Sequence, residues 1–198
     1  MEDKTAEIPF EIVKKAPNIL TLLRICLIPF FVVLLIHPNS ESRIWASIIF
    51  VIASLTDWLD GYIARAYQAE SILGTLLDPI ADKVLVMAAL VMLASADDAY
   101  KIPAWIVVCL LAREFLISGL RSLAAVKGTV VPASRAAKHK TGWTMLAIFF
   151  LLIAYDYQVF GYDISFYNLG IYCIWIALML SVGSGIQYAI ALKKFFWE

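Results

Sequence analysis

Histidine, cysteine and net charge are what this 198-residue sequence has least of. It has two histidines and three cysteines, no two cysteines stand in a C-x-x-C spacing, and 16 basic residues balance 16 acidic ones. Cys26, Cys109 and Cys173 each lie alone in apolar runs, which is typical of small core residues and not of disulfides or metal ligands. A net charge of zero argues neither for a nucleic acid nor for another polyanionic partner.

The sequence also lacks the pattern of a cleaved signal peptide. The first residues are rich in acids, and no A-x-A-like site follows the first apolar run, so we expect the N-terminal segment to be retained. Within residues 1–16, Ile8, Ile12 and Val13 fall roughly on one helical face. This predicts a short amphipathic helix at a membrane surface, followed by a single domain over residues 17–198.

Hydrophobic residues, by contrast, are abundant. They make up 62% of the chain, at a mean hydropathy of +0.82, which is more than a soluble core of this size needs. Apolar segments, most of them about 20 residues long or more, alternate with short polar turns. We therefore predict an all-α integral membrane protein with six transmembrane helices, over residues 17–36, 44–67, 72–95, 104–126, 141–155 and 166–192.

The charges of the turns predict how these spans are oriented. Both termini and the turns after the second and fourth spans carry an excess of lysine and arginine, whereas Arg43 and Lys101 are the only basic residues in the other turns. Basic loops tend to stay in the cytoplasm. We therefore expect a multi-pass protein of the cell membrane, with both termini and the end that joins the second and third spans on the cytoplasmic side.

Four aspartates at the ends of the second and third spans are the strongest chemical signal. Asp57 and Asp60 stand three residues apart and Asp78 and Asp82 four apart, so each pair lies on one face of its helix. The connection between the spans, residues 68–71, is short enough to make the two helices antiparallel neighbours, so the carboxylates can converge. Each carboxylate at membrane depth costs roughly 2.5–3.5 kcal/mol on insertion scales, so the group needs compensating cations.

Two divalent cations would match the four carboxylates in charge. Oxygen-only ligands favour Mg²⁺ or Mn²⁺. Zinc would favour histidine and cysteine, but His37 and His139 lie far from the aspartates and from any cysteine in the sequence. Pairing of the acids with Arg65, Lys83 or backbone donors is the simpler interpretation, and it leaves too few cations for four acids.

The aspartates belong to the longer pattern D-x2-D-G-x2-A-R-x8-G-x3-D-x3-D, with eight fixed positions. This pattern resembles the signature of the CDP-alcohol phosphatidyltransferases, which join the phosphatidyl group of CDP-diacylglycerol to an alcohol and release CMP. The resemblance implies that Asp57, Asp60 and Asp78 bind metal, and that Asp82 both binds metal and accepts the proton of the attacking hydroxyl. It also implies a homodimer.

The resemblance extends to residues that would bind CDP-diacylglycerol. Gly61 and Ala64 would leave room for the nucleotide, and Arg65 would pair with the diphosphate. Two interpretations remain for Asn18 and Thr21, which stand in P-N-I-L-T-L-L-R at the start of the first span: contact with the lipid diphosphate, or helix capping and packing. The full predicted donor set is Asn18, Thr21, Gly61, Ala64, Arg65, Ser71 and Gly74.

A second group of charges points to the acceptor. Arg113 and Arg121 are eight residues apart, about 80° around one helix, so both can face one cavity. Lys138 and Lys140 follow in the next connection. Such a cluster suits an acceptor that carries a dianionic phosphate. In a competing interpretation, Arg113 or Arg121 pairs with Glu114 or with the aspartates.

Four segments around these charges resemble the bacterial phosphatidylglycerophosphate synthases: A-R-E-F at 112–115, G-L-R at 119–121, K-H-K-T at 138–141 and S-G-I-Q-Y at 184–188. The resemblance runs from about residue 17 to the end of the chain, with one departure at Ala137, where relatives often have glycine. It implies sn-glycerol 3-phosphate as the acceptor. On their own, the small residues over 181–185 predict only close helix packing.

Other interpretations stay open. The eight-position signature is shared by enzymes that use inositol phosphate, serine, choline and other alcohols. A UbiA-like prenyltransferase also holds magnesium diphosphate with membrane aspartates, but it would have more spans and lacks G-x2-A-R between its acids. An ion transporter could use buried acids too, and would usually show inverted repeats, which are not evident in this sequence.

Overall fold

In the residues that it describes, the computed structural model has six α-helices and one small β-hairpin. It describes residues 10–67, 72–126, 135–159 and 161–196, and within these ranges the side chains of 10–18, 20, 57–67, 72–79, 82, 135–138, 159 and 191–196 are not described. The elements are α1 Phe10–Leu34, α2 Ser40–Tyr67, α3 Ile72–Ser95, α4 Ala104–Val126, α5 Arg135–Ile153, β1 Asp156–Val159, β2 Tyr162–Ser165 and α6 Phe166–Phe196.

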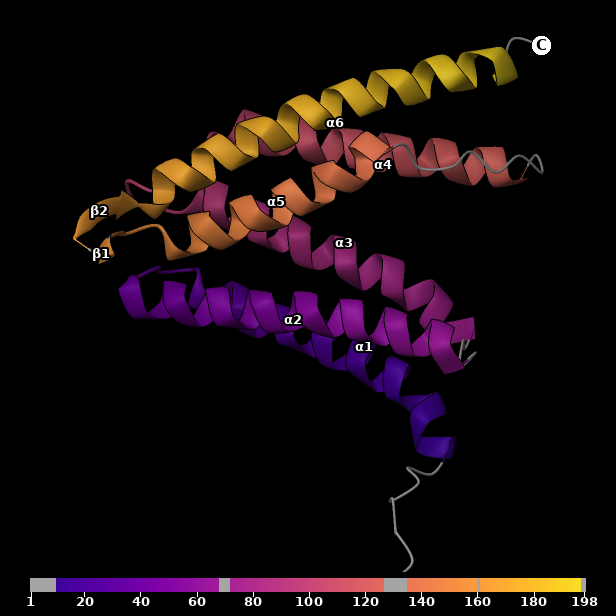
Figure 1. Ribbon diagram of the computed structural model, residues 1–198, viewed down its shortest axis with the longest axis horizontal. Helices are drawn as coiled ribbons and strands as arrows, with labels where there is room; N and C mark the ends of the chain where they lie inside the picture. The colour runs from indigo at the N-terminus through magenta and orange to yellow at the C-terminus, as the bar shows by residue number, and fades with distance from the viewer. Residues whose placement is uncertain (1–9, 68–71, 127–134, 160, 197–198) are drawn as a thin grey trace, which may run out of the picture.

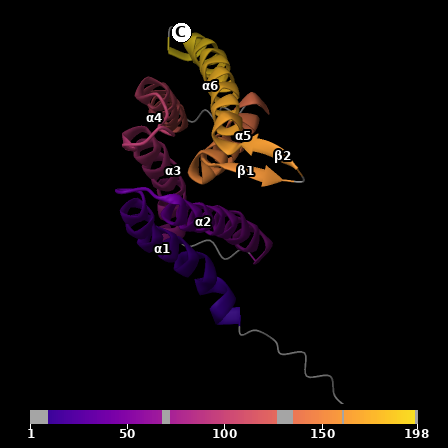
Figure 2. The same ribbon diagram turned by 90° about the vertical axis from the view of Figure 1, so that its left-hand side faces the viewer.

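Successive helices run in opposite directions (Figure 1). The junctions α1/α2 and α3/α4 and the β-hairpin therefore lie at one end of the molecule. The ends of α2 and α4, the starts of α3 and α5, and the end of α6 lie at the other. Seen from the hairpin end, α1 and α2 lie at the bottom, α4 and α6 at the top, and α3 and α5 between them (Figure 2). The alternation of the turns matches the predicted six-segment topology.

The helices meet in an apolar core. α5 packs along α6, and α1 packs along α2 and α3. Phe31, Phe50 and Ile148 are buried where these helices meet. A Cβ added to Gly170 on α6 would lie 2.6 Å from Leu151 Cγ and 3.0 Å from the Leu151 nitrogen. Glycine at this position therefore allows α6 to approach α5 closely.

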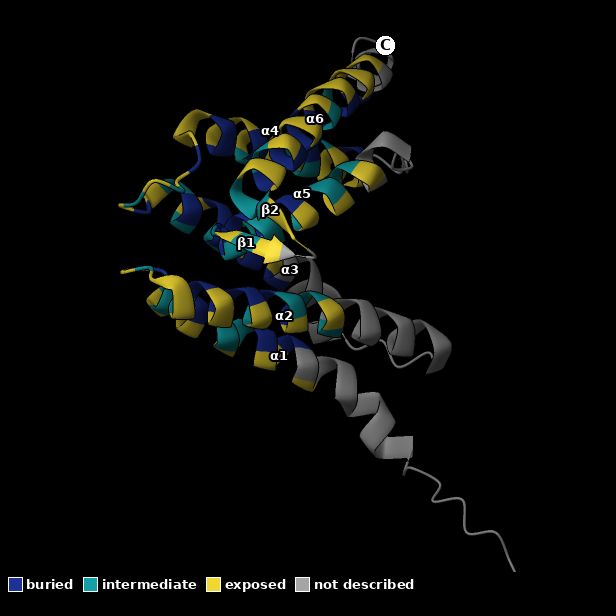
Figure 3. Ribbon diagram, turned by 60° about the vertical axis from the view of Figure 1, so that its left-hand side comes forward, coloured by how far each residue is buried: buried dark blue, intermediate teal, exposed yellow. Residues whose placement is uncertain are grey.

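Large apolar side chains also cover the outside. Each helix has exposed positions in its described part (Figure 3). Large apolar residues occupy some of them on every helix, among them Phe30, Trp45, Val91, Val108, Leu146 and Met179. Exposed apolar surface of this kind marks contact with a membrane, another protein chain or a ligand. Within the described residues one helix, over Phe166–Ile190, is by itself long and apolar enough to cross a membrane, while Thr21–Leu34, Lys83–Ser95 and His139–Ile153 are shorter apolar stretches.

The predicted boundaries hold best where a turn interrupts an apolar run. α3 and α4 begin and end at the predicted residues. α2 begins at Ser40, four residues earlier than predicted, because Asn39 and Ser42 cap it reciprocally: each backbone N–H donates to the other's side-chain oxygen at 2.8 Å.

Two helices also begin earlier than the hydropathy predicts. α5 begins at Arg135 instead of residue 141, because the basic segment that was expected to connect the spans is itself partly helical. α1 begins at Phe10 and runs through Pro17 without a break. The helical part of the predicted N-terminal segment is thus continuous with the first span, and residues 1–9 lie outside the description.

The predicted turn after α5 contains a feature that the sequence did not indicate. Over residues 156–165 the chain forms an antiparallel hairpin in which Asp156 pairs with Ser165 and Val159 with Tyr162. Gly161 in the turn has a φ of 82°, which favours glycine.

An ion pair fastens the hairpin end of the molecule. Arg43 is completely buried at the start of α2 and pairs with Asp98 of the α3–α4 turn. Its guanidinium also donates to the Leu151 carbonyl of α5 at 3.2 Å, and it lies over the ring of Tyr100, 5.8 Å from the ring centroid. One side chain thus connects three segments at this end, far from the predicted site.

Candidate active site

The four aspartates lie on two antiparallel helices. Asp57 and Asp60 lie within roughly the last three turns of α2, and Asp78 and Asp82 within roughly the first three turns of α3. Their placement on helices is confirmed. Their side chains lie outside the description, so the convergence of the carboxylates stays a prediction. Among the side chains that are described, no group of three or more His, Cys, Asp or Glu could hold a metal ion.

Most of the predicted donor-binding residues also lie in these helices. Gly61, Ala64 and Arg65 belong to α2, Gly74 to α3 and Asn18 to α1, with side chains outside the description. Ser71 is not described at all.

Thr21 on α1 is the one donor candidate whose side chain is described. It is completely buried, as is Arg24 almost one turn further along the helix. Burial of Thr21 fits the packing interpretation, while contact with a diphosphate stays a prediction. Arg24, the last residue of P-N-I-L-T-L-L-R, was not singled out by the sequence analysis, although a buried arginine in an apolar helix is a signal of function.

Arg113 and Lys140 converge on one carboxylate. Glu114 Oε2 accepts from Arg113 NH1 at 3.2 Å and from Lys140 Nζ at 2.5 Å. The interpretation that Arg113 pairs with Glu114 is therefore confirmed. The structure also brings together two of the four predicted phosphate-binding cations, one from α4 and one from α5. The side chain of Lys138, on α5, is not described.

Both arginines of α4 face α6. Arg113 Nε donates to the Ser181 carbonyl at 3.1 Å, and its NH2 donates to Ser184 Oγ at 2.8 Å. Two turns along α4, Arg121 Nε donates to Tyr188 Oη at 3.3 Å, and its guanidinium carbon lies 5.5 Å from the centroid of that ring. The two arginines thus share one side of α4, which faces α6. Neither is among the described residues that line the cleft between α3, α4 and α5, so their facing one cavity stays a prediction.

These contacts give a hydrogen-bonding role to residues of S-G-I-Q-Y, which overlaps the small residues 181–185 that on their own predict only close helix packing. Ser184 and Tyr188 are the first and last residues of S-G-I-Q-Y, and each holds one arginine of α4. A Cβ added to Gly185 would make only ordinary contact with Arg113, at 3.5 Å from its Cγ. The sequence offered one signal that could have found the pairs, since the four-residue spacing of Ser184 and Tyr188 places both on one face of α6.

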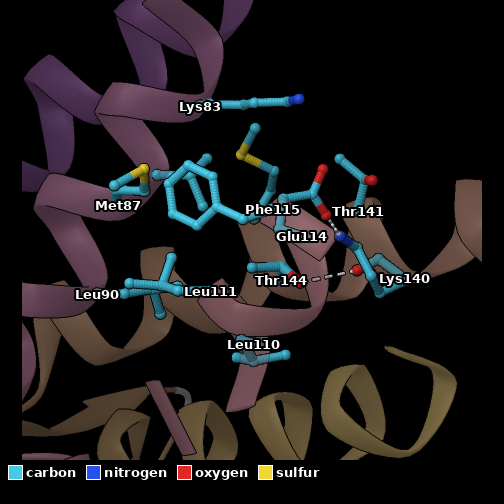
Figure 4. Close-up of a pocket in the computed structure, with 12 residues that line it drawn as sticks. Lys83, Met87, Leu90, Leu110, Leu111, Glu114, Phe115, Lys140, Thr141 and Thr144 are labelled. Atoms are coloured by element: carbon cyan, nitrogen blue, oxygen red, sulfur yellow. Dashed lines mark hydrogen bonds and ion pairs between the residues drawn. The ribbon is translucent and has the colours of Figure 1, made fainter. Parts of the chain in front are cut away.

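A cleft between α3, α4 and α5 lies beside this cluster (Figure 4). Its void, including the open mouth, is about 610 Å³. Most of its wall is apolar, and Lys83, Glu114 and Lys140 supply charge. Lys83 Nζ donates to Ser118 Oγ of α4 at 2.6 Å. The lining residues are Lys83, Val86, Met87, Leu90, Leu110, Leu111, Glu114, Phe115, Lys140, Thr141, Thr144 and Met145.

Known proteins resemble this chain over nearly its whole length. Residues 14–183 match the family described as CDP-alcohol phosphatidyltransferase. A CDP-diacylglycerol–glycerol-3-phosphate 3-phosphatidyltransferase of Rickettsia felis is 40% identical over 184 residues, which cover 92% of this chain and 98% of that protein. Proteins of the same name from Bacillus subtilis and Haemophilus influenzae are 36% and 39% identical, over 87% of this chain and 92% and 90% of theirs. The matched region includes both aspartate helices and the arginines of α4, and the chain belongs to the CDP-alcohol phosphatidyltransferase family.

Proposed function

We propose that this protein transfers the phosphatidyl group of CDP-diacylglycerol to sn-glycerol 3-phosphate, giving phosphatidylglycerol phosphate and CMP. The observation that carries the choice of acceptor is the cationic pair of Arg113 and Lys140 on Glu114, beside the cleft that Lys140 and Glu114 line. The names of relatives that cover about nine tenths of the chain support the same reaction.

The donor half of the site would be built on the aspartate helices. Four carboxylates with no histidine or cysteine near them in the sequence fit hard divalent cations. Asp57, Asp60, Asp78 and Asp82 would hold two ions, Mg²⁺ or Mn²⁺. When bound, such ions neutralise the diphosphate and stabilise the leaving phosphate oxygen. Arg65 would pair with the same diphosphate.

Beyond holding the metal ions and the diphosphate, the chain has to supply a base and space for the nucleotide. The acceptor hydroxyl oxygen attacks the β-phosphorus of CDP-diacylglycerol, the bond from that phosphorus to the bridging oxygen breaks, and CMP leaves with the bridging oxygen. Asp82 would accept the proton of the attacking hydroxyl. Gly61 and Ala64 would leave the nucleotide space beside the helix.

The acceptor half would use the cations of α4 and α5. A phosphomonoester dianion needs charge-assisted donors, which are the stronger class of hydrogen bond. Arg113, Arg121, Lys138 and Lys140 would supply them. Glu114 keeps the charged ends of Arg113 and Lys140 near each other, and Ser184 limits the freedom of the Arg113 guanidinium. Both features reduce the ordering cost of binding a phosphate.

We also propose that the six helices span the cell membrane and that the protein forms a homodimer. Both termini, and the end at which α2 meets α3, would lie at the cytoplasmic face. Exposed apolar side chains on all six helices support a lipid environment. The excess of lysine and arginine in the segments at one end supports the orientation. A cytoplasmic site would meet a water-soluble acceptor and a lipid-borne donor at one surface.

Product identification with several acceptors tests the proposal. The purified protein in lipid vesicles would be supplied with CDP-diacylglycerol, Mg²⁺ and, separately, glycerol 3-phosphate, glycerol, inositol phosphate or serine. We expect CMP release and phosphatidylglycerol phosphate only with glycerol 3-phosphate. Inositol phosphate is the second candidate, because it presents the same dianion to the cluster, and its exclusive use would overturn the assignment. So would efficient use of unphosphorylated glycerol.

A further inference from the structure

Lys83 on α3 has a chemical setting that the aspartate pattern does not explain. It follows Asp82 in the sequence, yet it reaches across to α4, where Nζ donates to the neutral hydroxyl of Ser118 at 2.6 Å. No ion pair of Lys83 occurs among the described side chains. A partly buried ammonium group whose described partner is neutral is costly in an apolar helix, which makes it a candidate for function.

The cleft connects Lys83 to the cations already assigned to the acceptor. Lys83 and Lys140 both line it, on α3 and α5, and Glu114 lies on α4 between them. In Figure 4 the Lys83 side chain extends along the cleft on the side where Glu114 and Lys140 meet. Thr141 and Thr144 border the same polar end, while residues such as Met87 and Leu111 form the apolar wall.

Charge balance indicates what this polar end can bind. Lys83, Lys140 and Glu114 line this end of the cleft. Arg113 does not line it but pairs with Glu114, so the four groups carry three positive charges and one negative charge. The two positive charges that remain match a phosphomonoester dianion. Without Lys83, Lys140 would be the one cation among the described residues that line the cleft.

We infer that Lys83 is a further acceptor-binding residue, whose ammonium binds the phosphate of the acceptor from the α3 side of the cleft while Lys140 binds it from the α5 side. This inference rests on the proposed function. Because Lys83 adjoins Asp82 on α3, it would also tie the position of the acceptor to the helix that carries the proposed base. Ser118 keeps the flexible lysine extended across the cleft before the acceptor arrives.

The competing explanation is that Lys83 only balances the charge of the aspartates. The two explanations differ in which substrate the variant Lys83→Met should affect. Loss of an acceptor contact raises the KM for glycerol 3-phosphate by about 10- to 100-fold and leaves the KM for CDP-diacylglycerol and the half-saturating Mg²⁺ concentration unchanged. Loss of a charge balance changes the Mg²⁺ requirement and the CDP-diacylglycerol KM.

The experiment measures both KM values, the Mg²⁺ dependence and the equilibrium binding of glycerol 3-phosphate to the full-length protein without CDP-diacylglycerol. Lys83→Arg, which keeps the charge, should bind within a few-fold of the wild type. Lys101→Met is the matched control, because Lys101 is an exposed lysine in the α3–α4 turn at the far end of the bundle. If Lys83→Met fails to fold, Lys83→Gln takes its place, since its shorter amide keeps polarity without charge.

The outcomes separate this inference from the proposed function. Wild-type protein that makes no product from glycerol 3-phosphate overturns the proposed function. Wild-type protein that does so, together with a folded Lys83→Met or Lys83→Gln variant of unchanged glycerol 3-phosphate KM and binding, overturns the role of Lys83 alone. A shift confined to Mg²⁺ and CDP-diacylglycerol likewise overturns it, in favour of charge balance.

Discussion

Glu114 and Lys140 form an ion pair of 2.5 Å between α4 and α5, and the same carboxylate oxygen accepts from Arg113. One acid thus holds two cations from different helices, of which Lys140 lines the polar end of the cleft. Removing a partly buried carboxylate from between two cations costs more stability than removing one partner of an exposed surface pair, because water screens the remaining charges less. Glu114 is therefore expected to be an organising residue of the proposed acceptor site.

Replacing this acid tests its organising role. Glu114→Gln should lower the free energy of unfolding by about 1–3 kcal/mol, between the values for exposed and buried pairs, because the Glu114 side chain is 32% exposed. The measurement is thermal unfolding in detergent, with Glu41→Gln on an exposed first turn of α2 as the control. A Glu114→Gln variant as stable as the control variant would contradict the prediction.

Close packing of α6 on α5 predicts a sharp difference between two glycines. In Gly170→Ala the new methyl group would lie 2.6 Å from Leu151 Cγ and 3.0 Å from the Leu151 nitrogen, so the helices must move apart. Overpacking of this kind typically costs about 1–3 kcal/mol. Gly119→Ala is the matched control, because a Cβ at this position on α4 meets nothing within 4 Å and alanine favours the helix.

The result is read from the unfolding midpoints of the two variants. Gly170→Ala should unfold at a lower temperature than the wild type, and Gly119→Ala at the same or a higher temperature. Equal midpoints for the two would show that α6 can shift away from α5 at little cost.

Replacing the aspartates should cause loss of transfer at one position and loss of metal binding at another. Asp82→Asn should abolish transfer while most binding of metal and CDP-diacylglycerol remains, because three carboxylates and Arg65 still hold the donor. Asp57→Asn should instead weaken metal binding, since it removes an anionic ligand. Calorimetric titration with Mg²⁺ or Mn²⁺ and CMP-release assays separate the two. Full activity of Asp82→Asn would remove Asp82 from the mechanism, and wild-type metal affinity of Asp57→Asn would count against that ligand.

The sequence predicts this fold well where hydropathy and turn residues coincide. α3 and α4 match because polar turns interrupt their apolar runs, whereas the starts of α1 and α5 lie in charged stretches where hydropathy falls but backbone hydrogen bonding continues. The hairpin over residues 156–165 was expected only as a turn. Its strands have four residues each, which is too short for an alternating pattern to stand out.

The sequence indicated which residues belong to the candidate site better than it indicated which of them contact each other. Adjacency in the chain suggested the pair of Arg113 with Glu114, which is present. Spacing within one helix indicated that Arg113 and Arg121 could face the same way, and both contact α6. The partners on α6, Ser184 and Tyr188, lie about 70 positions away, and only the way α4 packs on α6 decides which residues meet. No local pattern in the sequence carries that information.

Arg121 gives the most direct test of the acceptor assignment. If it binds the phosphate of glycerol 3-phosphate, Arg121→Ala removes a charge-assisted hydrogen bond of roughly 1.5–3 kcal/mol. At 1.4 kcal/mol per decade, this corresponds to a rise of about 10- to 150-fold in the acceptor KM, with the KM for CDP-diacylglycerol nearly unchanged. Steady-state kinetics in which each substrate is varied separately measure both values.

Tyr188 provides the control for this variant, because Arg121 Nε donates to its hydroxyl and the guanidinium lies over its ring. Tyr188→Phe removes the hydroxyl and keeps the ring, so the acceptor KM should rise far less than in Arg121→Ala. If Arg121 serves only to pack α4 against α6, Arg121→Ala lowers stability and impairs both substrates alike. Equal changes in the two KM values would therefore exclude Arg121 from the acceptor site, since a residue that touches one substrate cannot weaken both to the same degree.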